Sequence, residues 1–183
     1  MGIKFFQRLI VTTLLGFLTV SVIAGVVLTE ATLHPGRHLQ SSSDEMEGRE
    51  MAHRHESKLA DIAITAKDGI MLRAWSIRPG SSNGNAVILL HGLADNRVGM
   101  TGYAELLLSR GFSVLMPDAR AHGTSGGNLA TFGLLESDDI HRWLDWLEQN
   151  DRPECIFGLG ESMGARPVVA IVAIRNSLLR RCR

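Results

Sequence analysis

The stretch "CIFGLGESMGARP", residues 155–167, decides the fold of this chain. It begins with a short apolar run that is typical of a buried strand and continues into a glycine-rich turn. Residues 160–164, "GESMG", fit the pattern G-x-S-x-G, which places a serine at the tip of a strand-to-helix turn. Small neighbours let such a serine adopt a strained backbone that exposes its hydroxyl. The pattern predicts a nucleophilic Ser162 flanked by Gly160 and Gly164; the alternative is a turn with an idle serine.

The segments before this turn alternate between strand-like and helix-like patterns from residue 59 onward. Two β-rich runs flank Lys67-Asp68-Gly69, and Asp-Gly favours a hairpin. Continuous apolar runs at 86–90, 112–118 and 155–159 predict buried strands. Amphipathic segments at 100–111 and 132–150 predict helices, the first ended by a glycine, and an apolar segment follows residue 167. This order predicts an α/β fold in which a hairpin precedes parallel strands that alternate with helices.

Two of the predicted strands end in loops that carry polar residues. In "HGLAD", residues 91–95, Gly92 lets the backbone approach a substrate carbonyl, so the Leu93 N–H can donate to an oxyanion together with the Met163 N–H. We expect His91 to fix this loop by hydrogen bonds rather than to transfer protons. In "PDARAHGTSGG", residues 117–127, a Ser125–His122 pair is an alternative site, although nothing there indicates a strained turn.

The three motifs, in this order and spacing, resemble the α/β-hydrolase superfamily, in particular its serine aminopeptidase-like or monoacylglycerol-lipase-like branch. The resemblance covers residues 59–165, and Ala121 stands where that family usually has glycine. It implies hydrolysis of an ester, amide or thioester through an acyl-Ser162, with a small-molecule or peptide acyl substrate and no metal or organic cofactor. Under this resemblance the motif residues with structural roles are His91, Gly92, Asp118, Arg120, His122, Gly123, Ser125, Gly160 and Gly164.

The acid and the histidine that complete such a site are not found after Ser162. The family order is Ser, then Asp or Glu, then His, but residues 163–183 contain five arginines and none of these residue types. Pro167 also falls in the first turns of the expected helix. We therefore expect the front half of the fold, from a truncated or frame-shifted gene, with an unpaired edge at strand 155–159. The alternatives are a non-catalytic, membrane-tethered module and a partner chain that supplies the missing groups.

The N-terminal region predicts a membrane anchor. Residues 9–29 are uncharged, and as a helix this run of 21 residues is long enough to cross a hydrocarbon core of about 30 Å. Lys4 and Arg8 precede this run, so the positive-inside rule places residues 1–8 in the cytoplasm and the domain outside. A cleaved signal peptide is the competing interpretation, although its apolar region is usually shorter. Residues 30–58 are polar and predict a linker before a partial hydrolase domain at 59–183.

Composition and charge exclude several other functions. The 183 residues carry 19 Lys and Arg against 19 Asp and Glu, and this balance gives no basic face for nucleic acid. His53 and His55 lie in the charged linker without further ligands, so we expect solvated side chains rather than a metal site.

Overall fold

The computed structural model describes residues 2–167. These residues form two compact units, and the boundary between the units lies between His34 and Pro35. The first unit is the helix α1 (Gly2–Leu33), which includes the predicted span and is long and apolar enough to cross a membrane. Its threonine hydroxyls, such as those of Thr13, Thr19 and Thr29, donate to backbone carbonyls one turn earlier. These threonine hydroxyls are thus satisfied within the helix, as an apolar environment requires.

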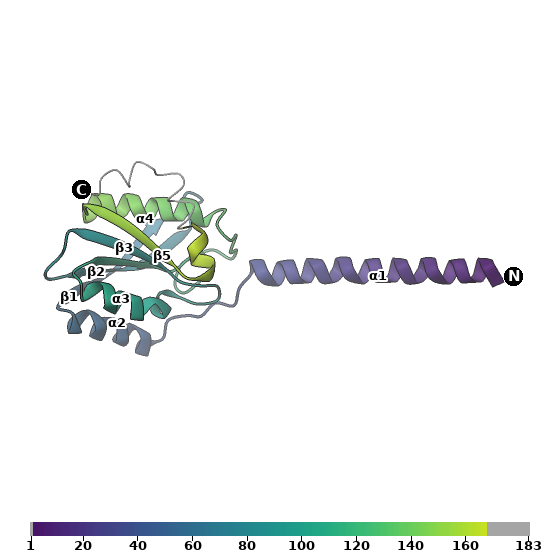
Figure 1. Cartoon of the computed structure of the whole chain (residues 1–183), viewed down its shortest axis with the longest axis horizontal. Coiled ribbons are helices and arrows are strands. Elements are labelled where there is room, and N and C mark those ends of the chain that lie inside the picture. The colour runs from purple at the N-terminus through teal and green to yellow at the C-terminus, as the bar shows by residue number, and fades with distance from the viewer. Residues whose placement is uncertain (1, 168–183) are drawn as a thin grey trace. The chain divides into compact units, whose positions relative to one another are not determined.

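The second unit contains a mixed sheet of five strands in the order β1-β2-β4-β3-β5 (Figure 1). The strands are β1 (Ser57–Thr65), β2 (Met71–Pro79), β3 (Asn85–Leu90), β4 (Ser113–Pro117) and β5 (Cys155–Gly160). β1 and β2 form the predicted hairpin around Gly69, whose φ of 84° suits glycine. β3 pairs in parallel with β4 and β5, while β2 runs antiparallel to β4. The predicted α/β class and the opening hairpin are confirmed.

Helices cover both faces of this sheet (Figure 1). The helices α2 (Ser42–Arg54) and α3 (Thr101–Leu108) lie on one face, and α4 (Glu136–Asn150) lies on the other. A single 3-10 turn, η1 (Arg97–Met100), leads into α3. Alternate residues of each strand point to opposite faces, so Val87 and Leu89 pack toward α2 and α3, whereas Ala86 and Ile88 pack toward α4. The two apolar layers therefore bury β3 on both faces.

The polar linker expected over residues 30–58 differs from the structure. Residues 30–33 extend α1, and residues 42–54 form α2, which begins at a capping box between Ser41 and Asp44. Met51 and Ala52 belong to the buried core. A side chain at Gly48 would collide with the Trp75 ring, with a Cβ only 2.4 Å from it, so α2 docks closely on the sheet. Gly48, Met51 and Ala52 form the buried face of α2, whereas Met46 is exposed, and the polar composition of the segment does not indicate this face.

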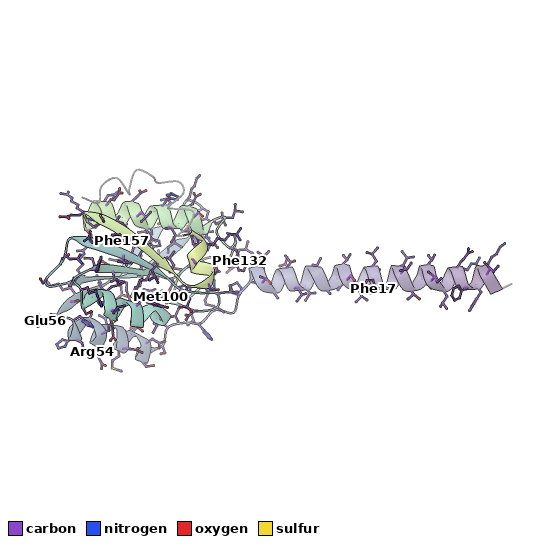
Figure 2. The ribbon with its side chains drawn as sticks, in the orientation of Figure 1. Phe17, Arg54, Glu56, Met100, Phe132 and Phe157 are labelled. Carbon is purple, nitrogen blue, oxygen red and sulfur yellow. The ribbon has the colours of Figure 1, made fainter. Side chains whose placement is uncertain are left out.

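Strand β5 is less buried than its apolar sequence predicts. Within residues 2–167 it pairs only with β3 and forms the edge of the sheet. The side chain of Phe157, labelled in Figure 2, remains 45% exposed. The prediction of a fully buried strand at 155–159 is therefore wrong for these residues, because the apolar layers on the two faces of the sheet cover β5 only in part. The predicted apolar segment after Pro167 lies outside the described residues.

Candidate active site

The turn after β5 holds Ser162 in the strained backbone that the sequence pattern predicts. Ser162 has φ of 50°, in the left-handed region that a residue with a side chain rarely adopts. The turn is fixed on both sides: the Glu161 N–H donates to the Leu90 carbonyl (2.9 Å), and the Gly164 N–H donates to the Glu161 carbonyl (2.8 Å). Ser162 is exposed, and its Oγ has no hydrogen-bond partner among residues 2–167. The fold thus presents this hydroxyl to solvent.

The two glycines of the motif are required by close backbone contacts. A Cβ at Gly160 would lie 2.2 Å from the Gly164 carbonyl oxygen, and a Cβ at Gly164 would lie 2.4 Å from that of Leu90. No side chain can relieve these contacts, because the colliding atoms belong to the backbone. The turn after β5 therefore packs directly on the end of β3, which brings two loops of the predicted site together.

The loop after β3 lies against Ser162. A Cβ built on Gly92 would be 3.6 Å from the Ser162 Cβ and 3.8 Å from the Glu161 carbonyl oxygen. Leu93 follows and is 40% exposed, while Met163 is buried at the start of η2 (Ser162–Gly164). The structure therefore brings together Gly92, Ser162 and Met163, three of the residues that sequence analysis singled out. The loop after β3 and the turn after β5 thus meet at Ser162.

His91 connects the first two motif loops. Its Nε2 accepts a hydrogen bond from the Ala119 N–H (3.0 Å), so this nitrogen is unprotonated. Its Nδ1 then carries the proton and donates to the Gly92 carbonyl at 2.7 Å. Burial lowers the pKa of His91, although the bond to Gly92 opposes this. With both nitrogens engaged, the imidazole fixes loop geometry and is not available to Ser162.

Asp118 is a structural anchor rather than an acid of the site. Its carboxylate accepts hydrogen bonds from the Arg97 N–H and guanidinium (2.9 and 2.7 Å) and from the Thr124 N–H (2.7 Å). Burial favours a raised pKa for Asp118, but these donors outweigh it and the pKa falls below its ordinary value. A Cβ at Gly123 would lie 2.2 Å from this carboxylate, which explains the glycine. Sequence analysis missed Arg97, because nothing in its neighbourhood indicates a buried charge.

The remaining polar residues of the loop after β4 are also engaged. Arg120 forms two hydrogen bonds to Asp139 of α4 (2.7 and 2.8 Å) and one to Asp68 of the hairpin turn (2.9 Å). Ser125 Oγ donates to the Asp118 carbonyl (2.8 Å) and accepts from the Arg73 N–H (2.9 Å). These bonds tie the loop to α4, to the hairpin and to itself.

His122 is fully buried and does not pair with Ser125. Its Nδ1 lies 2.8 Å from the Arg120 carbonyl, and its ring stands 5.3 Å from that of His91. The alternative Ser125–His122 site is therefore wrong, because both hydroxyl contacts of Ser125 go to the backbone. No histidine within residues 2–167 hydrogen-bonds Ser162, and none of those residues forms a cluster that could hold a metal ion.

A small cavity of about 30 Å³ lies behind the turn, between α4 and the sheet. Leu90, Trp143, Met163 and Pro167 are among the residues that line it. His91 and Gly164 also line this cavity, so within residues 2–167 it adjoins both the loop after β3 and the Ser162 turn.

Comparison with known proteins agrees with this architecture. The family model described as the alpha/beta hydrolase fold matches residues 85–182, more than half of the chain. An esterase of Pyrococcus furiosus, Pf2001, superimposes with a TM-score of 0.67 at 30% identity, over 80% of this chain and 55% of that protein. A serine hydrolase of Xanthomonas campestris, XC6422, has the same fold with a TM-score of 0.57 at 22% identity, over 64% of this chain and 57% of that one.

Two curated proteins are similar over part of their sequence. The uncharacterised protein YqkD of Bacillus subtilis is 31% identical over 105 residues, which are 57% of this chain and 34% of that protein. A Shewanella woodyi protein named acyl transferase is 30% identical over 112 residues, 58% of this chain and 36% of that protein. The chain thus spans little more than a third of the length of these relatives.

Proposed function

Because the chain belongs to the α/β-hydrolase fold family, we propose that Ser162 is the nucleophile of a serine hydrolase that acts on an ester, amide or thioester. The observation that carries the proposal is the strained, exposed serine at a turn whose glycines admit no side chain. Backbone strain of this kind persists only where the surrounding structure enforces it. The similarity to an esterase and to an acyl transferase supports chemistry at an acyl carbonyl.

In the proposed reaction, Ser162 Oγ attacks the carbonyl carbon of a small-molecule or peptide acyl substrate. The N–H groups of Met163 and Leu93 stabilise the negative charge on the carbonyl oxygen. The intermediate collapses, the alcohol, amine or thiol leaves with a proton, and an acyl-serine remains. Water then attacks this ester, releases the acid and restores the hydroxyl. The nucleophile is an oxygen in both steps, that of Ser162 and then that of water, and the proposed reaction uses no cofactor.

The proposal also requires a general base, and no histidine within residues 2–167 hydrogen-bonds Ser162. The base must accept the Ser162 proton and later return one to the leaving group. His91 and His122 hold the loops, and no histidine, aspartate or glutamate occurs at 163–183. We therefore propose that a histidine not among the described contacts of Ser162, such as one on a partner chain, takes this role.

A non-catalytic, membrane-tethered module is the second candidate. The observation that favours it is that Ser162 Oγ has no hydrogen-bond partner among residues 2–167, since a hydroxyl without a base is a weak nucleophile. In this candidate the turn has only a structural role, and the chain does not catalyse a reaction.

Labelling with a fluorophosphonate probe separates the two candidates. We compare the folded full chain with Ser162→Ala and with Ser81→Ala, a matched exposed serine away from the turn. Added imidazole serves as a substitute base. The hydrolase proposal expects labelling that imidazole accelerates, that persists in Ser81→Ala and that is absent in Ser162→Ala. A folded chain that stays unlabelled at every imidazole concentration contradicts an activated serine and favours the non-catalytic module.

For localisation, we propose that α1 is a single membrane span with the N-terminus in the cytoplasm. Lys4 and Arg8 support this orientation, and a cleaved signal sequence is the alternative. Protease protection in membrane vesicles tests both features, because a retained anchor keeps the domain membrane-bound and on the side opposite to residues 1–8.

A further inference from the structure

The chain enters the folded domain on the side of the sheet where the carboxyl ends of β3, β4 and β5 lie. This side carries Ser162, and we call it the Ser162 edge. Arg37 donates to the carbonyls of Ser125 (2.8 Å) and Gly127 (2.6 Å), in the loop after β4. The Asn96 side chain, in the loop after β3, donates to the His38 carbonyl at 3.2 Å. Because β3, β4 and β5 are parallel, these loops and the Ser162 turn all follow carboxyl ends of strands at one edge.

The covalent chain between α1 and this attachment is short. α1 ends at Leu33 and Arg37 is already bound to the domain. Four residues of extended chain reach at most about 14 Å. This limit holds at any angle between the helix and the domain. If α1 crosses a membrane, the edge that carries Ser162 therefore stays close to the bilayer surface.

The two edges of the sheet also differ in their exposed side chains. At the Ser162 edge, the exposed large apolar side chains are those of Leu39, Met71, Leu93, Leu129 and Leu134. Leu134 is the most open of these, at 77% exposure. Figure 2 labels Phe132, from the same loop as Leu134, at the end of the sheet where β5 enters its turn.

The opposite side of the sheet is more polar in the part of the chain that the structure describes. The loop between β2 and β3 presents exposed Ser81, Ser82 and Asn83, and the turn after α3 adds Arg110. The exposed large apolar side chains toward this side are those of Leu106 and Phe157, fewer than the five at the Ser162 edge. A lipid surface would favour the Ser162 edge, since burying exposed apolar side chains in lipid displaces water and lowers the free energy.

From the short tether and this asymmetry, we infer that the Ser162 edge is a membrane-contacting surface whose partner is the lipid bilayer that α1 crosses. Leu39, Leu93, Leu129 and Leu134 rest in the interfacial layer, and the hydrogen bonds of Arg37 fix the point where the chain enters the domain at this edge. The inference rests on the proposed span, but it does not require Ser162 to react.

Photocrosslinking in reconstituted vesicles tests this surface. The full chain is placed in phosphatidylcholine vesicles with benzoylphenylalanine at Leu134 or, as the matched control, at Ser81; both positions are exposed, so neither substitution disturbs the core. We expect lipid adducts several-fold more abundant at position 134 than at position 81. Equal yields, a reversed order or no adducts at either position in a folded, membrane-bound chain would overturn the inference.

A change in the tether distinguishes a clamped surface from a freely swinging domain. A flexible Gly-Ser insertion of about 20 residues between His34 and Pro35 lets the domain rotate away from the membrane. We expect adducts at position 134 to fall several-fold toward the position 81 level, and an unchanged yield contradicts the role of the short tether. Ser162→Ala should leave the adduct pattern unchanged, so failure of the hydrolase proposal remains distinguishable from failure of this one.

Discussion

The loop after β4 and the turn after β5 start from similar sequences and end in opposite states. Both are rich in glycine and polar residues, and both follow strands at the same edge of the sheet. In the first, Asp118, Arg120 and Ser125 are buried and hydrogen-bonded. In the second, Ser162 is exposed, strained and without a hydrogen-bond partner among the described residues. A polar residue of such a motif has a structural role where its hydrogen bonds are satisfied. It is a candidate for chemistry where the fold leaves its side chain exposed.

Removing the charge of Asp118 should give the largest loss of stability. Asp118→Asn leaves the buried Arg97 guanidinium without its counter-ion, and breaking a buried pair in this way costs about 3–5 kcal/mol. Denaturant titration followed by tryptophan fluorescence measures the free energy of unfolding. Arg49→Gln, which breaks an exposed pair with Asp61, is the control and should change little. If Asp118→Asn lowered the free energy of unfolding only slightly, the hydrogen bonds of Asp118 would not be what holds the loop after β4 in place.

Adding a methyl group to the turn after β5 should have the next largest effect. Gly164→Ala places a Cβ among backbone atoms of β3 that cannot move aside, so we expect a loss of about 1–3 kcal/mol. Gly102→Ala is the matched control, because that helical glycine has open space around it and alanine favours a helix by about 1 kcal/mol. The same denaturant titration should thus move in opposite directions for the two variants. Equal effects would mean that the turn is not packed on β3.

The neutral state of His91 makes stability depend on pH. Its pKa is lowered in the folded domain from an ordinary value of 6.5, so the unfolded chain takes up a proton first as pH falls. The free energy of unfolding should therefore decrease as pH falls below 6.5. His91→Gln removes this titration and should flatten the profile measured between neutral and mildly acidic pH. An unchanged slope in the variant would assign the dependence to another group.

Relieving backbone strain should give the smallest effects, with a sign opposite to the first predictions. Glycine adopts positive φ without strain, so Ser162→Gly should stabilise the chain by about 1 kcal/mol while removing the nucleophile. Ala121 also has positive φ, at 61°, and Ala121→Gly should stabilise by about 0.5–1 kcal/mol. Thermal unfolding compares the two. Destabilisation by Ser162→Gly would show that the serine hydroxyl has a structural contact after all.

The sequence predicted the parts of this molecule that depend on local pattern. Asp68-Gly69 located the hairpin, the apolar runs located β3 and β4, and the G-x-S-x-G spacing located the strained Ser162. It missed α2, although Ser41 and Asp44 form a capping box that could have indicated its start. The few apolar residues of α2 are buried only because Trp75 and other residues of the sheet pack against them.

By itself, the sequence determined which residues could occupy strained turns, cross a membrane or build a strand, because these properties follow from side-chain size, polarity and spacing along the chain. The tertiary structure decided which polar groups meet. Arg97 finds Asp118 across 21 positions, Arg37 reaches the loop after β4, and Gly92 lies against Ser162. Such pairings depend on how the strands are ordered in the sheet, and sheet order is set by packing between residues that are distant in sequence.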